Sequence, residues 1–176
     1  MPLVSVLMPA KNAEAHLDEA VRSILGQALL DLELVAVDDV STDRTGEILE
    51  GFARRDARIQ VVKGPGRGIS AALNAGLAVC RAPLIARMDA DDVAHEDRLR
   101  QQVDVLESDP RLAAVGSQVE IIPRETMSDG LRAYEAWLNS LTDADLVMRE
   151  RLVESPLVHP AATIRSSPAR RRWLAR

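Results

Sequence analysis

Three acids crowd into four positions at the end of an apolar run. The stretch LIARMDADDVAHEDR, residues 84–98, places Asp89, Asp91 and Asp92 directly after the run, with no basic residue between them. Carboxylates this close repel each other unless a cation lies among them. If the run is a strand, Asp89 and Asp91 point to the same side. They could then share a hard cation such as Mg²⁺ or Mn²⁺, whose remaining ligands are typically water and substrate phosphates.

A plainer interpretation of the same acids stays open. Asp92 could cap the helix that follows, and Asp89 and Asp91 could be solvated loop residues. A second acidic pair, Asp38 and Asp39, ends another apolar run and is followed by VSTDRT. A carboxylate there can accept the ring N–H of a pyrimidine base. A helix cap explains one residue of this stretch, but it does not explain two acids before it.

The loop GPGRG, residues 64–68, could let the backbone approach a ligand closely, and Arg67 could reach a phosphate. It is not a P-loop, because the Gly-Lys-Ser/Thr ending is absent. It is not a dinucleotide fingerprint either, because that motif follows the first strand. An ordinary flexible turn is the alternative.

Strand-like and helix-like segments alternate along the first two thirds of the chain. We predict strands at residues 4–8, 32–37, 58–62, 84–88 and 113–119. We predict helices at residues 13–27, at about 43–55, at 69–79 and at 94–108. Continuously apolar strands between helices indicate an α/β domain with a mostly parallel, Rossmann-like sheet covered on both faces. Ligands of such sheets bind at the carboxyl ends of the strands.

Two local predictions refine this pattern, and the signal weakens after them. Pro9 should end the first strand, and Asn12 should cap the first helix. Beyond residue 119 we expect a polar helical region over residues 123–155 and one more strand within residues 156–165.

Composition bounds the class of protein. The chain has 176 residues and a net charge of −5, which fits one domain and does not indicate a nucleic-acid partner. The single Cys80 cannot form an internal disulfide, so we expect a reducing compartment. Without a signal peptide or membrane span we expect a cytoplasmic protein. The arginine-rich tail, residues 166–176, is either a disordered end or a peripheral contact with an anionic membrane at its inner face.

Four stretches together resemble the family 2 glycosyltransferases, which have the A-type nucleotide-sugar-binding fold. They are VSVLMPAKN (residues 4–12), LVAVDDVSTDRT (34–45), GISAALNAGLA (68–78) and IARMDADD (85–92). The resemblance covers about residues 3–120 and continues faintly through SPLVHPAATIR, residues 155–165. It implies a donor-binding half at residues 1–120 and a partial acceptor-side segment at residues 121–165.

The resemblance also implies roles for individual residues. The donor site would comprise Pro9, Ala10, Asn12, Asp38, Asp39, Arg67, Asp89, Ala90 and Asp91. Pro9 and Ala10 would border the base, and Asp39 would read it. Asp91 would bind the divalent metal, Mg²⁺ or Mn²⁺, with Asp89 near the ribose and the metal's waters. Arg67 or the glycine backbone around it would lie near the diphosphate.

The implied reaction is metal-assisted, inverting sugar transfer from a nucleotide-diphosphate donor, expected to be a UDP-sugar. The acceptor would be a hydroxyl of a saccharide or lipid-linked molecule in cell-surface polysaccharide or glycolipid synthesis. Inverting members use a carboxylate that follows the His-containing strand, but here no Asp or Glu follows Glu154. No catalytic base is therefore assigned, and we expect a truncated or frame-shifted chain after about residue 165.

Three alternatives remain beside this interpretation. The chain could be a nucleotide-sugar-binding module that lacks the base and does not transfer. It could be another metal-dependent enzyme, such as a nucleotidyltransferase. An incomplete domain could also expose apolar surface and form homo-oligomers.

Overall fold

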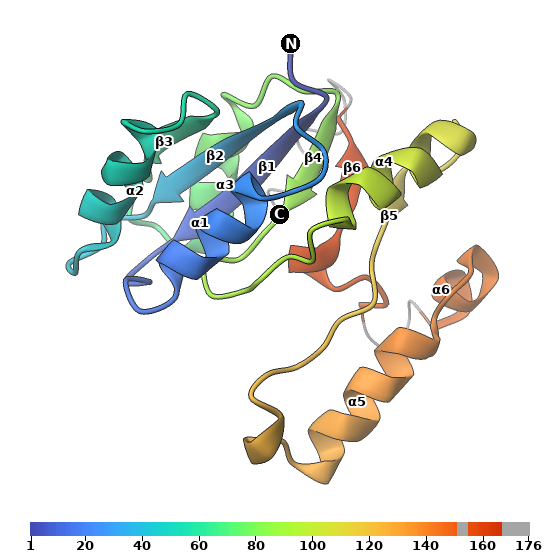
Figure 1. Cartoon of the computed structure of the whole chain (residues 1–176). Coiled ribbons are helices and arrows are strands. Elements are labelled where there is room, and N and C mark those ends of the chain that lie inside the picture. Colours follow the sequence, from blue (N-terminus) through green and yellow to red (C-terminus); the bar gives the residue numbers. More distant parts are fainter. Residues whose placement is uncertain (151–154, 167–176) are drawn as a thin grey trace.

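The computed structural model describes residues 1–150 and 155–166. Within them, six strands form one sheet in the order β3-β2-β1-β4-β6-β5 (Figure 1). The strands are β1 (Val4–Ala10), β2 (Leu32–Asp38), β3 (Ile59–Lys63), β4 (Leu84–Arg87), β5 (Ala114–Val115) and β6 (Thr163–Arg165). The first four strands pair in parallel, and β6 runs antiparallel to β4 and β5. The predicted α/β class with a mostly parallel sheet is confirmed.

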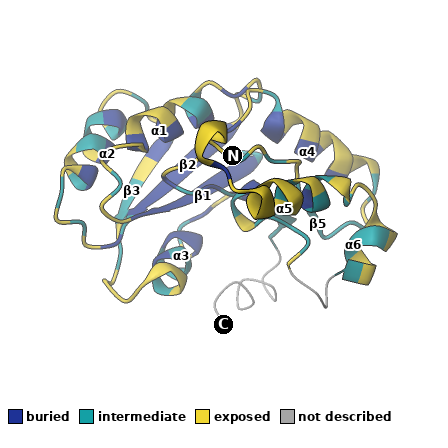
Figure 2. Cartoon of the chain, turned by 90° about the horizontal axis from the view of Figure 1, so that it is seen from below, coloured by how far each residue is buried: buried dark blue, intermediate teal, exposed yellow. Residues whose placement is uncertain are grey.

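Helices cover both faces of the sheet. The helices are α1 (Leu17–Leu25), α2 (Thr45–Ala53), α3 (Ile69–Leu77), α4 (Arg98–Ser108), α5 (Asp129–Ser140) and α6 (Ala144–Glu150), with 3₁₀ turns η1 (Arg124–Thr126) and η2 (His159–Ala161). Alternate residues of a strand point to opposite faces, so Leu34 and Ala36 pack with α1, α2 and α4, whereas Val35 and Val37 pack with α3. The buried residues are concentrated in these central strands (Figure 2).

The prediction that Pro9 ends the first strand is wrong, and the hydrogen-bond pattern gives the reason. Leu7 accepts from Met88 N on the β4 side, and Ala10 accepts from Asp39 N on the β2 side. The backbone N and O of successive strand residues point alternately to the two neighbouring strands, so the N of Pro9 points toward β4. The last residue of β1 that pairs with β4 is Leu7. The N–H that proline lacks would have had no partner there, so β1 continues to Ala10 beside β2.

Two predicted helix starts are also wrong. The helix α1 begins at Leu17 rather than near residue 13, and Asn12, at φ 52°, does not cap it. The helix α4 begins at Arg98. Residues 94–96 instead bond to α1 and to the segment after it: Ala94 N donates to Ser23 Oγ at 3.1 Å, and Gln27 Nε2 donates to His95 O at 2.7 Å. Asp92 is therefore too far from α4 to cap it.

The C-terminal part of the described chain leaves the sheet and returns to it. The predicted strand at residues 113–119 is reduced to Ala114–Val115. After it, α5 and α6 lie apart from the sheet, and β6 then inserts between β4 and β5 (Figure 1). The predicted helical region holds α5 and α6, although residues 151–154 lie outside the described part. None of the described helices combines the length and apolarity needed to span a bilayer.

Candidate functional site

The direction in which successive strands are added to the sheet reverses between β1 and β4. The candidate residues meet at the carboxyl ends of these strands. From β1 the chain adds β2 and β3 on one side, then crosses to place β4 on the other. Ligands of open α/β sheets bind at the carboxyl ends of strands beside such a switch. Ala10 pairs directly with Asp38, and Leu7 pairs with Arg87. The ends of β1, β2 and β4 therefore bring the acids at 38–39 and 89–92 to one edge.

Asp39 is the centre of the β2 side of this edge. Its side chain is buried, and both carboxylate oxygens accept backbone N–H groups, Oδ1 from Gly66 at 2.7 Å and Oδ2 from Gly68 at 3.2 Å. A Cβ at Gly64 would lie 2.6 Å from Asp39 Oδ1, so only glycine fits there. A carboxylate has about four acceptor positions. Asp39 thus holds the glycine loop and still has capacity for another donor.

Asp38 and Asn12 bind the loop between β2 and α2. Asp38 Oδ1 accepts from Ser41 N at 3.0 Å, and Asn12 Oδ1 accepts from Thr42 N at 2.8 Å. Asn12 N in turn donates to Ser41 Oγ at 3.0 Å. Val40 lies within this loop at φ 61°, a conformation that is strained for a β-branched residue. These bonds fix the loop that carries Asp39 into the site.

The second acidic group lies in a turn after β4. Asp92 N bonds to Asp89 O at 3.4 Å, and Arg87 Nη2 lies 2.5 Å from Asp89 Oδ1. Burial raises the pKa of Asp89; Arg87 opposes the rise, and Asp92 and Asp91 add to it. Burial and then Asp91 likewise raise the pKa of Asp92. Three carboxylates thus lie near two guanidinium groups, those of Arg87 and Arg98, and Asp91 is exposed.

The chemistry of these oxygens fits a hard divalent cation. No group of three or more His, Cys, Asp or Glu side chains among the described residues is arranged to hold a metal. Asp89 and Asp91 can therefore supply only part of a coordination shell. Mg²⁺ and Mn²⁺ are commonly bound in this way, with substrate phosphates and water supplying the other ligands.

The remaining predicted residues take different positions at this edge. Pro9 and Ala90 are buried. Arg67 is exposed in the glycine loop and has no hydrogen-bond or ion-pair partner among the residues that the structure describes. His159 lies on η2, with its Nε2 3.3 Å from Ser155 Oγ, and η2 lies against β4, the strand that leads into the acidic turn.

Two arginines of this edge were not predicted from the sequence. Arg87 could have been noticed as a charge inside an apolar strand run. Arg98 gave no signal, yet it is buried and its Nη2 donates to Arg87 O at 2.7 Å. Burial lowers the pKa of Arg98 to about 10, with Asp92 opposing the shift. Arg98 thus fixes the backbone from which the acidic turn starts.

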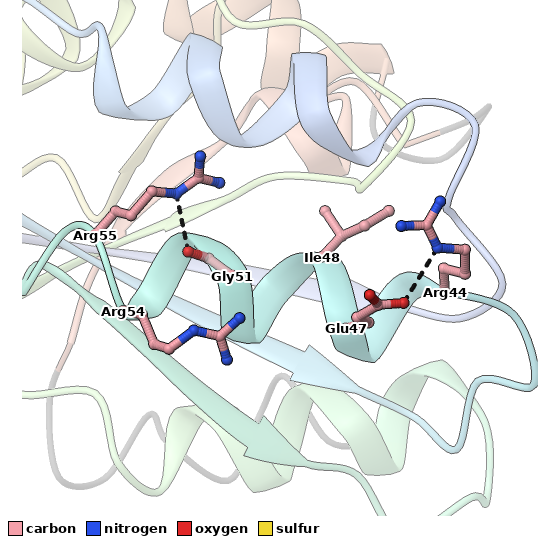
Figure 3. Close-up of a pocket in the computed structure, with 6 residues that line it drawn as sticks. All are labelled: Arg44, Glu47, Ile48, Gly51, Arg54 and Arg55. Atoms are coloured by element: carbon pink, nitrogen blue, oxygen red, sulfur yellow. Dashed lines mark hydrogen bonds and ion pairs between the residues drawn. The ribbon is translucent and has the colours of Figure 1, made fainter.

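A hollow of about 360 Å³ lies elsewhere, on the outer side of α2 (Figure 3). It is lined by Arg44, Glu47, Ile48, Gly51, Arg54 and Arg55. Two of its arginines are already engaged, Arg44 with Glu47 at 3.1 Å and Arg55 with Gly51 O at 3.0 Å. None of the strand-end acids lines it. We therefore place the candidate site at the sheet edge.

Curated proteins have sequences similar to that of this chain. The sequence profile described as Glycosyl transferase family 2 matches residues 5–171. An uncharacterized glycosyltransferase of Haemophilus influenzae is 35% identical over 149 residues, which cover 82% of this chain and 46% of that protein. A chondroitin synthase of Escherichia coli is 34% identical over 125 residues, 71% of this chain and 18% of that protein. The chain thus spans less than half the length of these relatives.

Solved structures show the same fold. A mannosyltransferase from Pyrobaculum calidifontis, determined with GDP-Man and Mn²⁺, has a TM-score of 0.62 and 30% identity over 68% of this chain and 36% of that one. TarS of Staphylococcus aureus matches 94% of this chain and 47% of its own, with a TM-score of 0.70 and 19% identity. The sheet order, the two groups of acids at its edge and the profile match over nearly the whole sequence agree: this chain belongs to glycosyl transferase family 2.

Proposed function

We propose that this chain carries the donor site of a glycosyltransferase that moves a sugar from a nucleoside-diphosphate donor to a hydroxyl acceptor. The observation that carries the proposal is the convergence of Asp39, the glycine loop and the acidic turn at one sheet edge. Residues 1–120 would form the donor half and residues 121–165 part of the acceptor side. The acceptor would be a saccharide or lipid-linked molecule of cell-surface polysaccharide or glycolipid synthesis.

Asp39 would read the base of the donor. Its two loop bonds leave acceptor positions that can take a ring N–H of the base. Uracil offers such a group, and we propose a UDP-sugar as the donor. Guanine and thymine also carry a ring N–H, so GDP and dTDP are the nucleotides to compare. Pro9 and Ala10, at the end of the neighbouring strand, would border the base.

Asp89 and Asp91 would hold the divalent cation. When bound, Mg²⁺ or Mn²⁺ stabilises the charge that develops on the departing diphosphate. The chain's own contribution is to fix the turn, through the Arg98 bond to Arg87 O, and to leave Asp91 open to the donor. Arg67 would approach the diphosphate from the glycine loop. We propose inversion at the sugar, and we assign no catalytic base.

Calorimetric titration tests the donor site. We expect UDP to bind in the presence of Mn²⁺ and not in its absence. Asp91→Asn should weaken UDP binding about tenfold or more, because it removes a charged metal ligand. Asp104→Asn, at an exposed position of α4, should leave binding unchanged. A chain that melts cooperatively but binds none of UDP, GDP and dTDP with Mn²⁺ would contradict the proposal.

Product analysis separates the alternatives. Release of free sugar from a bound donor, or its transfer to an acceptor, supports an enzyme. Metal-dependent nucleotide binding without either outcome supports a binding module that lacks the base. Incorporation of the nucleotide portion into a product would indicate a nucleotidyltransferase.

A further inference from the structure

Arg87 lies on the same side of β4 as Asp89. Leu84, Ala86 and Met88 pack with α1 and α4, whereas Ile85 packs with α3. Alternation along the strand therefore turns Arg87 and Asp89 to the α3 side. The glycine loop ends at Gly68, directly before α3, on this same side of the sheet. Arg87 thus faces the region where a diphosphate would lie under the proposed function.

Hydrogen bonds hold the backbone of Arg87, but part of the hydrogen-bonding capacity of its guanidinium is unused. Its N donates to Ala162 O at 2.9 Å, and its O accepts from Arg98 Nη2 at 2.7 Å. The side chain is 17% exposed and bonds to Asp89 through Nη2 at 2.5 Å. Its Nε is buried and has no hydrogen-bond partner among the described residues. A guanidinium has five donors, and leaving them unmade in a buried site is costly.

A divalent cation would compete with Arg87 for Asp89. Both are attracted to the same carboxylate, and the divalent ion carries twice the charge. Once the ion takes Asp89, the Arg87 guanidinium needs another anion. In a loaded site the donor diphosphate supplies such an anion beside the turn, and a planar guanidinium can bind it through two parallel N–H groups.

Resting on the proposed function, we propose that Arg87 is a donor-binding residue. It neutralises Asp89 while no cation is bound, and it binds the donor diphosphate once the cation occupies Asp89. Arg87 therefore weakens binding of the metal alone but strengthens binding of the nucleotide in the presence of the metal. A residue that only supported the fold would affect both in the same direction.

The test measures the two binding steps separately. Binding of Mn²⁺ alone is followed by electron paramagnetic resonance, and binding of UDP in saturating Mn²⁺ by calorimetry. For Arg87→Gln we expect Mn²⁺ alone to bind about threefold more tightly, because its competitor is removed. We expect UDP to bind about tenfold more weakly, because a charge-assisted contact is lost. Arg111→Gln is a matched control, since Arg111 also pairs with an acid two residues away, Asp109, at 2.8 Å.

Opposite shifts in the two affinities support the proposal, and shifts in the same direction or no shift overturn it. If Arg87→Gln does not melt cooperatively, the same two affinities are measured for Arg87→Lys. It should retain Mn²⁺ binding and weaken UDP about threefold, because an ammonium binds phosphate without the fork; unchanged UDP binding would overturn the proposal. Wild-type chain that binds no nucleotide with Mn²⁺ overturns the proposed function and this inference together. Wild-type binding with an unaffected Arg87→Gln overturns this inference alone.

Discussion

At the scale of single residues, Glu33 shows how a carboxylate becomes part of the fold rather than of a site. It lies on β2 near the amino edge of the sheet, and its side chain is 2% exposed. Its oxygens accept from Ser5 Oγ at 2.5 Å and Arg81 N at 2.7 Å, and Arg81 Nη2 lies 2.6 Å away. Burial by itself raises the pKa of Glu33, but these bonds together outweigh burial and lower it.

This lowered pKa gives stability a definite pH dependence. The contribution of Glu33 is present above the ordinary pKa of a glutamate and is lost as pH falls through the lower pKa of the folded state. We expect Glu33→Gln to cost about 1–3 kcal/mol at neutral pH. We also expect it to flatten the decline in melting temperature below about pH 5. Glu47→Gln, in an exposed pair with Arg44, should retain the wild-type pH profile. An unflattened profile in Glu33→Gln would contradict this assignment.

The acids of the candidate site could be proposed from the sequence, but their bonding partners could not. Asp39, Asp89 and Asp91 stand out because polar residues end apolar runs. The loop amides that Asp39 binds lie 27 and 29 residues away, and only the fold brings them together. Arg87 and Arg98 are separated by 11 positions and meet because α4 folds back over the end of β4. Such pairings depend on tertiary packing, which local patterns do not encode.

At the scale of elements, α3 packs against the sheet at Gly76, where a side chain has no room. An ideal Cβ at Gly76 would lie 2.4 Å from Leu7 Cδ1 and 2.7 Å from Val37 Cγ2. Alanine is the better helix former by about 1 kcal/mol. Overpacking a tight core, however, typically costs about 1–3 kcal/mol. The distance between α3 and the sheet bears on the candidate site, because α3 begins directly after the loop that Asp39 holds.

We therefore expect Gly76→Ala to lower the free energy of unfolding by up to about 2 kcal/mol, since overpacking at these short contacts exceeds the helix gain. Gly51→Ala in α2 is the matched control. A Cβ there would approach no atom nearer than 3.8 Å, so alanine should stabilise by about 0.5–1 kcal/mol. Urea unfolding of both variants measures whether each substitution lowers or raises the free energy of unfolding. A Gly76→Ala chain as stable as the wild type would show that α3 can move outward at little cost.

Strands and helices could be predicted where their hydrophobic pattern is strong, but the residues at which they begin and end could not. The four parallel strands and the helices between them follow from apolar runs and helical periodicity. Their boundaries depend on neighbours. The strand β1 continues through Pro9 because its pairing with β4 has ended, and α4 starts late because α1 and the segment after it bind residues 94–96. Beyond residue 113 the strand shortens to Ala114–Val115, since only this stretch pairs with β6.

At the scale of the whole molecule, the chain divides into a packed sheet and a loosely packed arm. The arm comprises α5 and α6, which lie apart from the sheet (Figure 1). Leu138 is the only buried residue of α5, and α6 has none (Figure 2). The side-chain bonds of α5 reach the segment just before it: Asn139 Oδ1 accepts from Val119 N at 2.9 Å, and Glu135 Oε2 accepts from Ile121 N at 2.6 Å.

Local stability should follow this division. Elements with few buried contacts open at low free energy, whereas core strands open only with global unfolding. In hydrogen exchange followed by mass spectrometry, we expect α5 and α6 to exchange first and β1 and β2 last. Equal protection of α5 and β1 would contradict this, unless a second copy covers α5, whose Leu131 and Tyr134 are 44% and 40% exposed. Repeating the exchange at about tenfold lower protein concentration separates these cases, because self-association weakens on dilution whereas packing within one chain does not.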